Sequence, residues 1–129
     1  MILDSDILIY FLKGEKKVVE EVLKIASDEL FTTRVNYTEL LYGEYNSSKI
    51  EDNLTKFKNF LERFTILEFD ERSSEIFAQT KAKLKKEGNI IADMDLMIAS
   101  IAIANEQELA TNNHKHFERI RNLKTLKWL

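Results

Sequence analysis

The sequence predicts an α/β protein with a mainly parallel sheet of four or five strands, covered by helices on both faces. Three observations lead to this fold class. Short apolar runs alternate along the chain with longer stretches in which apolar residues recur at helical spacing. The stretch Leu96–Ala104 is apolar on every side apart from Ser100, so we expect a central, buried helix there. The 129 residues are 44% hydrophobic and 32% charged, which suits a single domain over residues 1–129.

The first half of the chain supplies two of the expected strands and four of the expected helices. Apolar and β-branched residues form the two short strand-like runs. The helical stretches have apolar residues three and four positions apart, and Gly14 stands where a helix stop is expected. The expected strands are Met1–Asp4 and Leu30–Thr33, and the expected helices are Ser5–Leu12, Glu15–Ala26, Tyr37–Tyr45 and Glu51–Phe64.

The second half continues the alternation, which favours parallel strands joined by helical crossovers. Gly88 is expected to end one of its helices. The last strand should lie at an edge of the sheet. The expected strands are Ile66–Phe69, Glu108–Thr111 and Thr125–Trp128, and the expected helices are Ser73–Glu87, Leu96–Ala104 and His116–Ile120.

Several classes of site are excluded by composition. Without cysteine the chain has no disulfide, thiolate nucleophile or cysteine zinc site, and its two histidines are too few for a histidine-rich metal site. No apolar run approaches the roughly 20 residues of a membrane helix. No basic leader precedes Asp4, so we expect a cytoplasmic protein without a membrane segment.

The charge is unevenly divided along the chain. Residues 1–80 contain 10 Lys and Arg against 16 Asp and Glu, whereas residues 81–129 contain 9 against 6. Basic patches of this kind can contact nucleic-acid phosphates, although a solvated helix face and tail would have the same composition. The candidates for nucleic-acid binding are Lys115, Arg119 and Arg121. The full patches are Lys81, Lys83, Lys85 and Lys86, and then Lys115, Arg119, Arg121, Lys124 and Lys127.

Acidic and amide side chains follow the expected strands at one edge of the sheet. Ligands bind beyond the carboxyl ends of strands in open parallel sheets. Asp4 follows the first strand, Glu39 belongs to the stretch after the second, and Asn112 and Asn113 follow the fourth. Asp95 enters the buried helix. Four separate segments are therefore expected to bring acids or amides to one end of the molecule.

These acids differ in how strongly the sequence favours a functional role. Asp4 is expected to be partly buried, and metal binding or catalysis is favoured over helix capping because Ser5 and Asp6 are available as caps. For Asp6 itself, a capping or supporting role is favoured over metal ligation. Glu39 taken alone is more typical of a surface glutamate.

The two acids before the buried helix also have alternatives. Asp95 is expected to be the N-cap of Leu96–Ala104, with one oxygen capping and the other free for a cation. Asp93, in less regular backbone, is an auxiliary acid. Ligands made only of oxygen suit Mg²⁺ or Mn²⁺, and converging carboxylates would repel one another without such an ion. Chemistry on a phosphodiester is the natural use of this assembly.

Four segments together resemble the PIN-domain family, and specifically its VapC-type toxins. They are ILDSDILIYFLKG, TTRVNYTELLYG, GNIIADMDLMIASIAIA and LATNNHKHFERIRNLKTLKWL, in that order over nearly the whole chain. The resemblance implies a three-layer α/β/α sandwich and a Mg²⁺- or Mn²⁺-dependent endoribonuclease acting on RNA. It also implies a homodimer and a cognate antitoxin. Asp4, Glu39 and Asp95 match the family's acids and are the expected metal ligands.

Two departures from the family pattern affect the expected site, and the first motif carries one of them, with Ser5 and Asp6 where Thr and Asn are common. Thr111 is followed by Asn112 and Asn113 where many relatives have an Asp. Asn113 can offer a carbonyl oxygen to a metal-bound water but no charge, which favours a single metal ion. The expected catalytic set is therefore Asp4, Glu39, Asp95 and Asn113. The expected auxiliary residues are Ser5, Asp6, Asp93 and Thr111.

Two other functions remain open at this point. Asp4 and Asp6 after a buried strand also fit a haloacid-dehalogenase-type phosphatase with Asp4 as nucleophile, although Leu8 stands where those enzymes usually have Thr. A non-catalytic module that binds RNA or protein would use the same pocket. Aromatic residues on two helices either fill the core or, by the family resemblance, line a groove for the antitoxin's tail. They are Tyr42, Tyr45, Phe57, Phe60 and Phe64.

Overall fold

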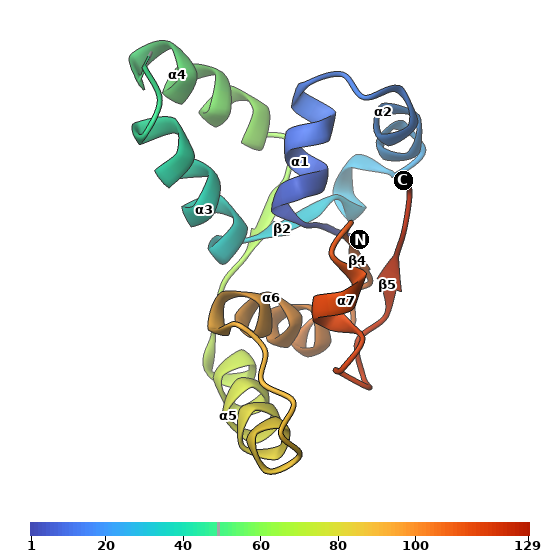
Figure 1. The fold of residues 1–129 in the computed structure, drawn as a ribbon. Helices are drawn as coiled ribbons and strands as arrows, with labels where there is room; N and C mark the ends of the chain where they lie inside the picture. Colours follow the sequence, from blue (N-terminus) through green and yellow to red (C-terminus); the bar gives the residue numbers. More distant parts are fainter. Residues whose placement is uncertain (49) are drawn as a thin grey trace.

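A five-stranded, wholly parallel sheet forms the centre of the molecule in the computed structural model, which describes residues 1–48 and 50–129 (Figure 1). The strand order is β3-β2-β1-β4-β5, so the expected parallel sheet is confirmed and the last segment of the chain is an edge strand as expected. The strands are β1 (Ile2–Leu3), β2 (Phe31–Thr33), β3 (Thr65–Leu67), β4 (Leu109–Ala110) and β5 (Thr125–Leu126).

Helices connect successive strands. Each expected helix is found, with ends that differ by a few residues, and a 3₁₀ turn (Ser27–Glu29) follows α2. The glycines predicted to stop helices do so, because Gly14 and Gly88 adopt φ of +76° and +73°, which glycine tolerates best. The helices are α1 (Ser5–Leu12), α2 (Lys16–Leu23), α3 (Arg34–Tyr45), α4 (Ile50–Leu61), α5 (Glu71–Lys86), α6 (Asp93–Ala104) and α7 (His114–Phe117).

The first strand occupies the middle of the sheet. Ile2 pairs in register with Phe31 of β2 on one side and with Leu109 of β4 on the other. Its backbone N–H donates to the carbonyl of Glu108 at 2.8 Å, and the N–H of Asp4 donates to Ala110 at 3.0 Å. The polar residues that follow β1, β2 and β4 therefore meet at one edge of the sheet.

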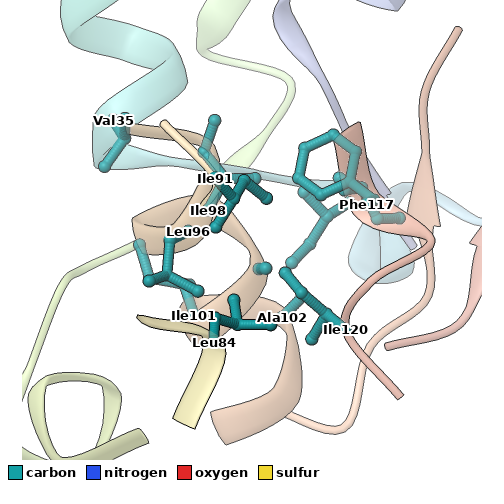
Figure 2. Close-up of a cluster of buried hydrophobic side chains, with 12 residues drawn as sticks. Val35, Leu84, Ile91, Leu96, Ile98, Ile101, Ala102, Phe117 and Ile120 are labelled. Atoms are coloured by element: carbon teal, nitrogen blue, oxygen red, sulfur yellow. The ribbon is translucent and has the colours of Figure 1, made fainter. Parts of the chain in front are cut away.

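Two hydrophobic cores lie on opposite faces of the sheet. Ile2 and Leu109 belong to the core under α5, α6 and α7, which Figure 2 shows in close-up. The next residues along the strands, Leu3 and Ala110, belong to the core under α1, α2 and α4. Strand side chains alternate between faces, so these two cores make the fold a three-layer α/β/α sandwich, as the family resemblance implies.

The helix α6 is buried as predicted. Its residues Leu96, Ile98, Ala99 and Ile101 are at most 1% exposed, and it packs between α5 and the sheet (Figure 2). Among the described residues, no helix is both long and apolar enough to cross a membrane.

Candidate active site

Asp4 stands at the carboxyl end of the central strand and is the most tightly held side chain of the site. It is only 4% exposed. Its Oδ1 accepts hydrogen bonds from the Ser5 N–H at 2.9 Å and from the Asn36 amide at 2.8 Å, and its Oδ2 accepts from the Thr111 hydroxyl at 2.7 Å. The expectation that Ser5 or Asp6 would be the cap of this helix is wrong. Asp4 itself is the N-cap of α1, because its extended backbone turns the carboxylate back onto the first N–H of the helix.

Asn36 links Asp4 to the Ser5 hydroxyl, which in turn contacts Glu39. No motif in the sequence had marked Asn36 as a site residue. It is completely buried, and its amide Nδ2 donates both to Asp4 and to the Ser5 hydroxyl at 2.9 Å. Its Oδ1 accepts from the Thr33 hydroxyl at 2.6 Å, and the Thr33 Oγ1 in turn accepts from the Asn36 N–H. Thr33 followed three residues later by Asn36 was a capping signal that would have placed the start of α3 at Arg34.

Glu39 lies on α3, one turn beyond Asn36. The Ser5 hydroxyl donates to its Oε1 at 3.1 Å. Burial raises the pKa of Glu39, and repulsion from the carboxylates of Asp4, Asp95 and Asp6 raises it further. These acids come from the residue after β1 and from α1, α3 and α6, so the structure brings together side chains that the sequence had placed at one edge of the sheet.

Asp95 lies in the first turn of α6 and not before it. The prediction that it is the N-cap is wrong, because the N-cap is Ala92, whose carbonyl accepts the Leu96 N–H at 3.0 Å. Asp93 is likewise helical, so its expected position in irregular backbone is wrong too. The Asp95 side chain is 22% exposed, and its Oδ2 lies 3.2 Å from Nδ1 of His116.

Asp93 points to a different neighbour. Its Oδ1 accepts from the ammonium group of Lys81 at 2.9 Å, and both side chains are more than half exposed. This ion pair joins α5 to the start of α6. Lys81 is one of the basic residues that the charge pattern had made a candidate for phosphate contact.

Asp6 and the residues after β4 form the other side of the site. The Asp6 Oδ1 accepts from the Ile7 N–H at 2.7 Å and its Oδ2 from the Asn112 N–H at 3.0 Å, which fits the supporting role expected of it. The Asn113 N–H donates to the Thr111 hydroxyl oxygen at 3.0 Å. The contact of Asn113 with the cluster is therefore made by its backbone, while the predicted use of its side-chain carbonyl stays a prediction.

The electrostatics of this cluster favour a cation. Burial is the largest cause of the raised pKa of Asp4 and of Asp6, and repulsion from Asp6 raises the pKa of Asp4 further. Within the described part of the chain, no three His, Asp or Glu side chains are arranged as a ready-made metal cage. Mg²⁺ does not need such a cage, because it keeps several waters and uses one or two carboxylates. The all-oxygen donors of Asp4, Glu39 and Asp95 fit a hydrated ion of this kind.

The basic candidates lie on α7 and in the segment after it. Lys115 and Arg121 are exposed, whereas the guanidinium of Arg119 donates to the carbonyl of Ile90 at 2.6 Å and so holds the loop before α6. Nucleic-acid binding by these residues stays a prediction.

The aromatic residues divide between core and surface. Phe57, Phe60 and Phe64 are buried, whereas Tyr42 and Tyr45 on α3 are 70% and 59% exposed. An open groove of about 360 Å³ runs between α1 and α3, and neither tyrosine is among the residues that line it. Its lining is mainly apolar, with Glu39 among the polar residues, and consists of Ile9, Leu12, Lys13, Glu39, Leu40, Gly43 and Glu44.

Comparison with known proteins gives consistent matches over the whole chain. A sequence profile described as PIN domain matches residues 1–123. The chain is 31% identical over 127 residues to Ribonuclease VapC2 of Haemophilus influenzae, covering 98% of this chain and 96% of that protein. It is 30% identical over 126 residues to the tRNA(fMet)-specific endonuclease VapC of Shigella flexneri, with the same coverage.

A solved structure agrees with this match. In the crystal structure of VapBC2 from Rickettsia felis bound to a DNA fragment from its promoter, one chain aligns with a TM-score of 0.89 at 32% identity. That alignment covers 99% of this chain and 98% of the other.

Proposed function

The chain belongs to the PIN-domain family, and on this premise we propose that it is the toxin ribonuclease of a VapBC-type toxin–antitoxin pair. It is an endoribonuclease that hydrolyses phosphodiester bonds of RNA. The observation that carries the proposal is the meeting of Asp4, Glu39 and Asp95 at the carboxyl edge of the sheet, where burial and mutual repulsion raise the pKa of Glu39. Residues 1–129 form one PIN-like nuclease domain in this proposal.

Divalent-metal dependence is a general property of PIN-domain nucleases. Asp4 and Asp95, with Glu39 beside them, would hold Mg²⁺ or Mn²⁺ directly or through waters. When bound, such an ion lowers the pKa of a water molecule and offsets charge on the scissile phosphate.

The protein's own side chains orient the reacting groups. The Ser5 hydroxyl holds Oε1 of Glu39, so Oε2 is the oxygen that accepts a hydrogen bond from the attacking water. The three donors to Asp4 fix its carboxylate before substrate arrives, so little reorganisation is needed at the moment of reaction. Asn113 adjusts the polar surroundings, and exposed Lys115 contacts the flanking RNA.

The phosphatase alternative is less well supported by this geometry. Leu8, which stands where those enzymes usually have Thr, is completely buried in the core under α1, α2 and α4, and the similar curated proteins are named ribonucleases and endonucleases. A purely binding module is disfavoured because the similar curated proteins are named ribonucleases and endonucleases.

The partner in this proposal is an antitoxin protein whose apolar segment lies in the groove between α1 and α3. Ile9, Leu12 and Leu40 provide the apolar lining, and Glu39 at the groove would pair with a cationic side chain of the antitoxin. Such a pair would block the water-orienting oxygen of Glu39. We also propose that the protein is a homodimer and acts in the cytoplasm, where its RNA substrate lies.

The proposed activity is tested with purified protein freed of antitoxin and incubated with structured RNA. Cleavage is expected with Mg²⁺ or Mn²⁺, and it should stop in EDTA. Asp95→Asn should lose at least about 100-fold in rate, because a removed charge at the reacting centre costs several kcal/mol. Asp28→Asn is the matched control, since Asp28 is an exposed acid in the 3₁₀ turn outside the carboxylate cluster. Full activity of the protein in EDTA or of Asp95→Asn would refute the mechanism.

A further inference from the structure

The three central carboxylates are not held in the same way. Asp4 accepts three hydrogen bonds and Glu39 accepts one from Ser5. For Asp95, the described residues provide a single side-chain partner, Nδ1 of His116 at 3.2 Å from Oδ2. The orientation of Asp95 therefore depends on His116, a residue of α7 that lies 21 positions further along the chain.

The short helix α7 is fixed firmly enough to serve as that support. Phe117 is 1% exposed and packs in the core under α6. The His116 N–H donates to the carbonyl of Asn113 at 3.0 Å, and Nδ1 of His114 lies 3.2 Å from the Thr125 hydroxyl of β5. His114 thus ties the start of α7 to β5, and Phe117 anchors its end in the core, so the position of this helix is set by the core and not by solvent.

We infer that His116 is a positioning residue for the divalent ion of the ribonuclease. Its Nδ1–H donates to Oδ2 of Asp95 and leaves Oδ1, which would hold the ion directly or through a water. This inference rests on the proposed function. Hydrogen bonds to metal-binding carboxylates typically change metal affinity by about 10- to 100-fold when they are removed. The side chain of Asp95 sits on the first turn of a helix and would otherwise sample several rotamers.

The two nitrogens of the imidazole can be separated by substitution. In His116→Asn the amide nitrogen lies near the place of Nδ1, whereas in His116→Gln it lies near the place of Nε2. His116→Ala removes both donors. Glu118→Ala is the control for changes on this helix, because Glu118 is exposed at the C-terminal end of α7.

The measurement is the Kd of Mn²⁺ for each variant without RNA, from the electron paramagnetic resonance signal of free Mn²⁺, followed by kcat and KM for a single-site RNA. His116→Ala and His116→Gln should weaken Mn²⁺ binding about 10-fold and lower kcat with little change in KM. His116→Asn should stay within about 3-fold of the unaltered protein on the same basis. Thermal melting in EDTA verifies that every variant is folded.

The possible outcomes separate this inference from the proposed function. If His116→Gln keeps the Mn²⁺ affinity and His116→Asn loses it, the positioning role is overturned, because the effect would then belong to Nε2. Unchanged Mn²⁺ affinity in His116→Ala would also overturn it while leaving the ribonuclease intact. If the unaltered protein neither binds Mn²⁺ nor cuts RNA, both proposals fail together.

Discussion

The hydroxyl of Thr111 is the best single place to test the architecture of the site. The side chain is completely buried, its Oγ1 donates to the Asp4 carboxylate at 2.7 Å, and the same oxygen accepts the Asn113 N–H at 3.0 Å. Thr111→Val keeps the shape of the side chain and removes both hydrogen bonds. The hydrogen bond to a charged acceptor contributes about 1.5–3 kcal/mol and the second about 0.5–1.5 kcal/mol, so we expect a loss of about 2–4.5 kcal/mol in the free energy of unfolding.

The loss should depend on pH in a defined direction. Burial raises the pKa of Asp4 in the folded protein, and the Thr111 hydrogen bond opposes that effect because it stabilises the ionised carboxylate. The destabilisation by Thr111→Val is therefore complete at pH values above the folded-state pKa of Asp4. It declines as the pH falls through that pKa, because the neutral acid gains less from the hydroxyl.

Urea denaturation in EDTA measures this effect. With a slope of about 2 kcal/mol/M, in the middle of the typical range, the expected loss lowers the midpoint by about 1–2 M near neutral pH, and by less near pH 4. Thr38→Val is the matched control: its hydroxyl bonds to the Arg34 carbonyl on the exposed side of α3, so the change should be within about 0.5 kcal/mol. An equal midpoint for Thr111→Val and the unaltered protein, or the same loss at both pH values, would refute the reasoning.

Three other predictions follow from the same geometry. Glu39→Gln should abolish RNA cleavage yet raise the melting temperature in EDTA at neutral pH. The folded protein raises the pKa of Glu39 and so disfavours its ionised form, a cost that Gln removes; a lower melting temperature would contradict this. Arg34→Ala breaks a two-pronged ion pair with Glu68, but both groups are exposed, so thermal melts should report a loss of no more than about 1 kcal/mol. Leu12→Lys should leave RNA cleavage unchanged and weaken antitoxin binding by at least about 5-fold in calorimetry, since Leu12 is 46% exposed and lines the apolar groove; unchanged affinity would exclude this docking surface.

The alternation of strands and helices was predictable because buried parallel strands are short continuous apolar runs, whereas amphipathic helices repeat apolar residues every three or four positions. Helix ends were less predictable, because they depend on which residue caps the helix. The helix predicted from Glu15 to Ala26 ends at Leu23, which is 74% exposed and gives the core no reason to extend it. The helix α3 begins three residues earlier than predicted because the Thr33 side chain caps it.

The acids of the site were predictable from their positions after strands, but their supporting partners were not. Asn36 reaches Asp4 across 32 residues of sequence, and His116 reaches Asp95 across 21. Contacts of this range depend on how helices pack, which local patterns do not report. The error over Asp95 has a different origin, because α6 begins at Asp93 with Ala92 as N-cap and no side-chain cap hydrogen bond, so no capping residue marked its start in the sequence.

The central place of β1 in the sheet determines when the active site can form during folding. One of the two neighbours of β1 in the sheet is β4, and the Thr111 hydroxyl that holds Asp4 follows β4, 107 positions further along the sequence than Asp4. A chain in which β4 has not yet paired lacks one of the two strand pairings that position Asp4. Such long-range closure is slow compared with local helix formation. The active site is therefore complete only once β4 has paired with β1, whatever helices have already formed between them.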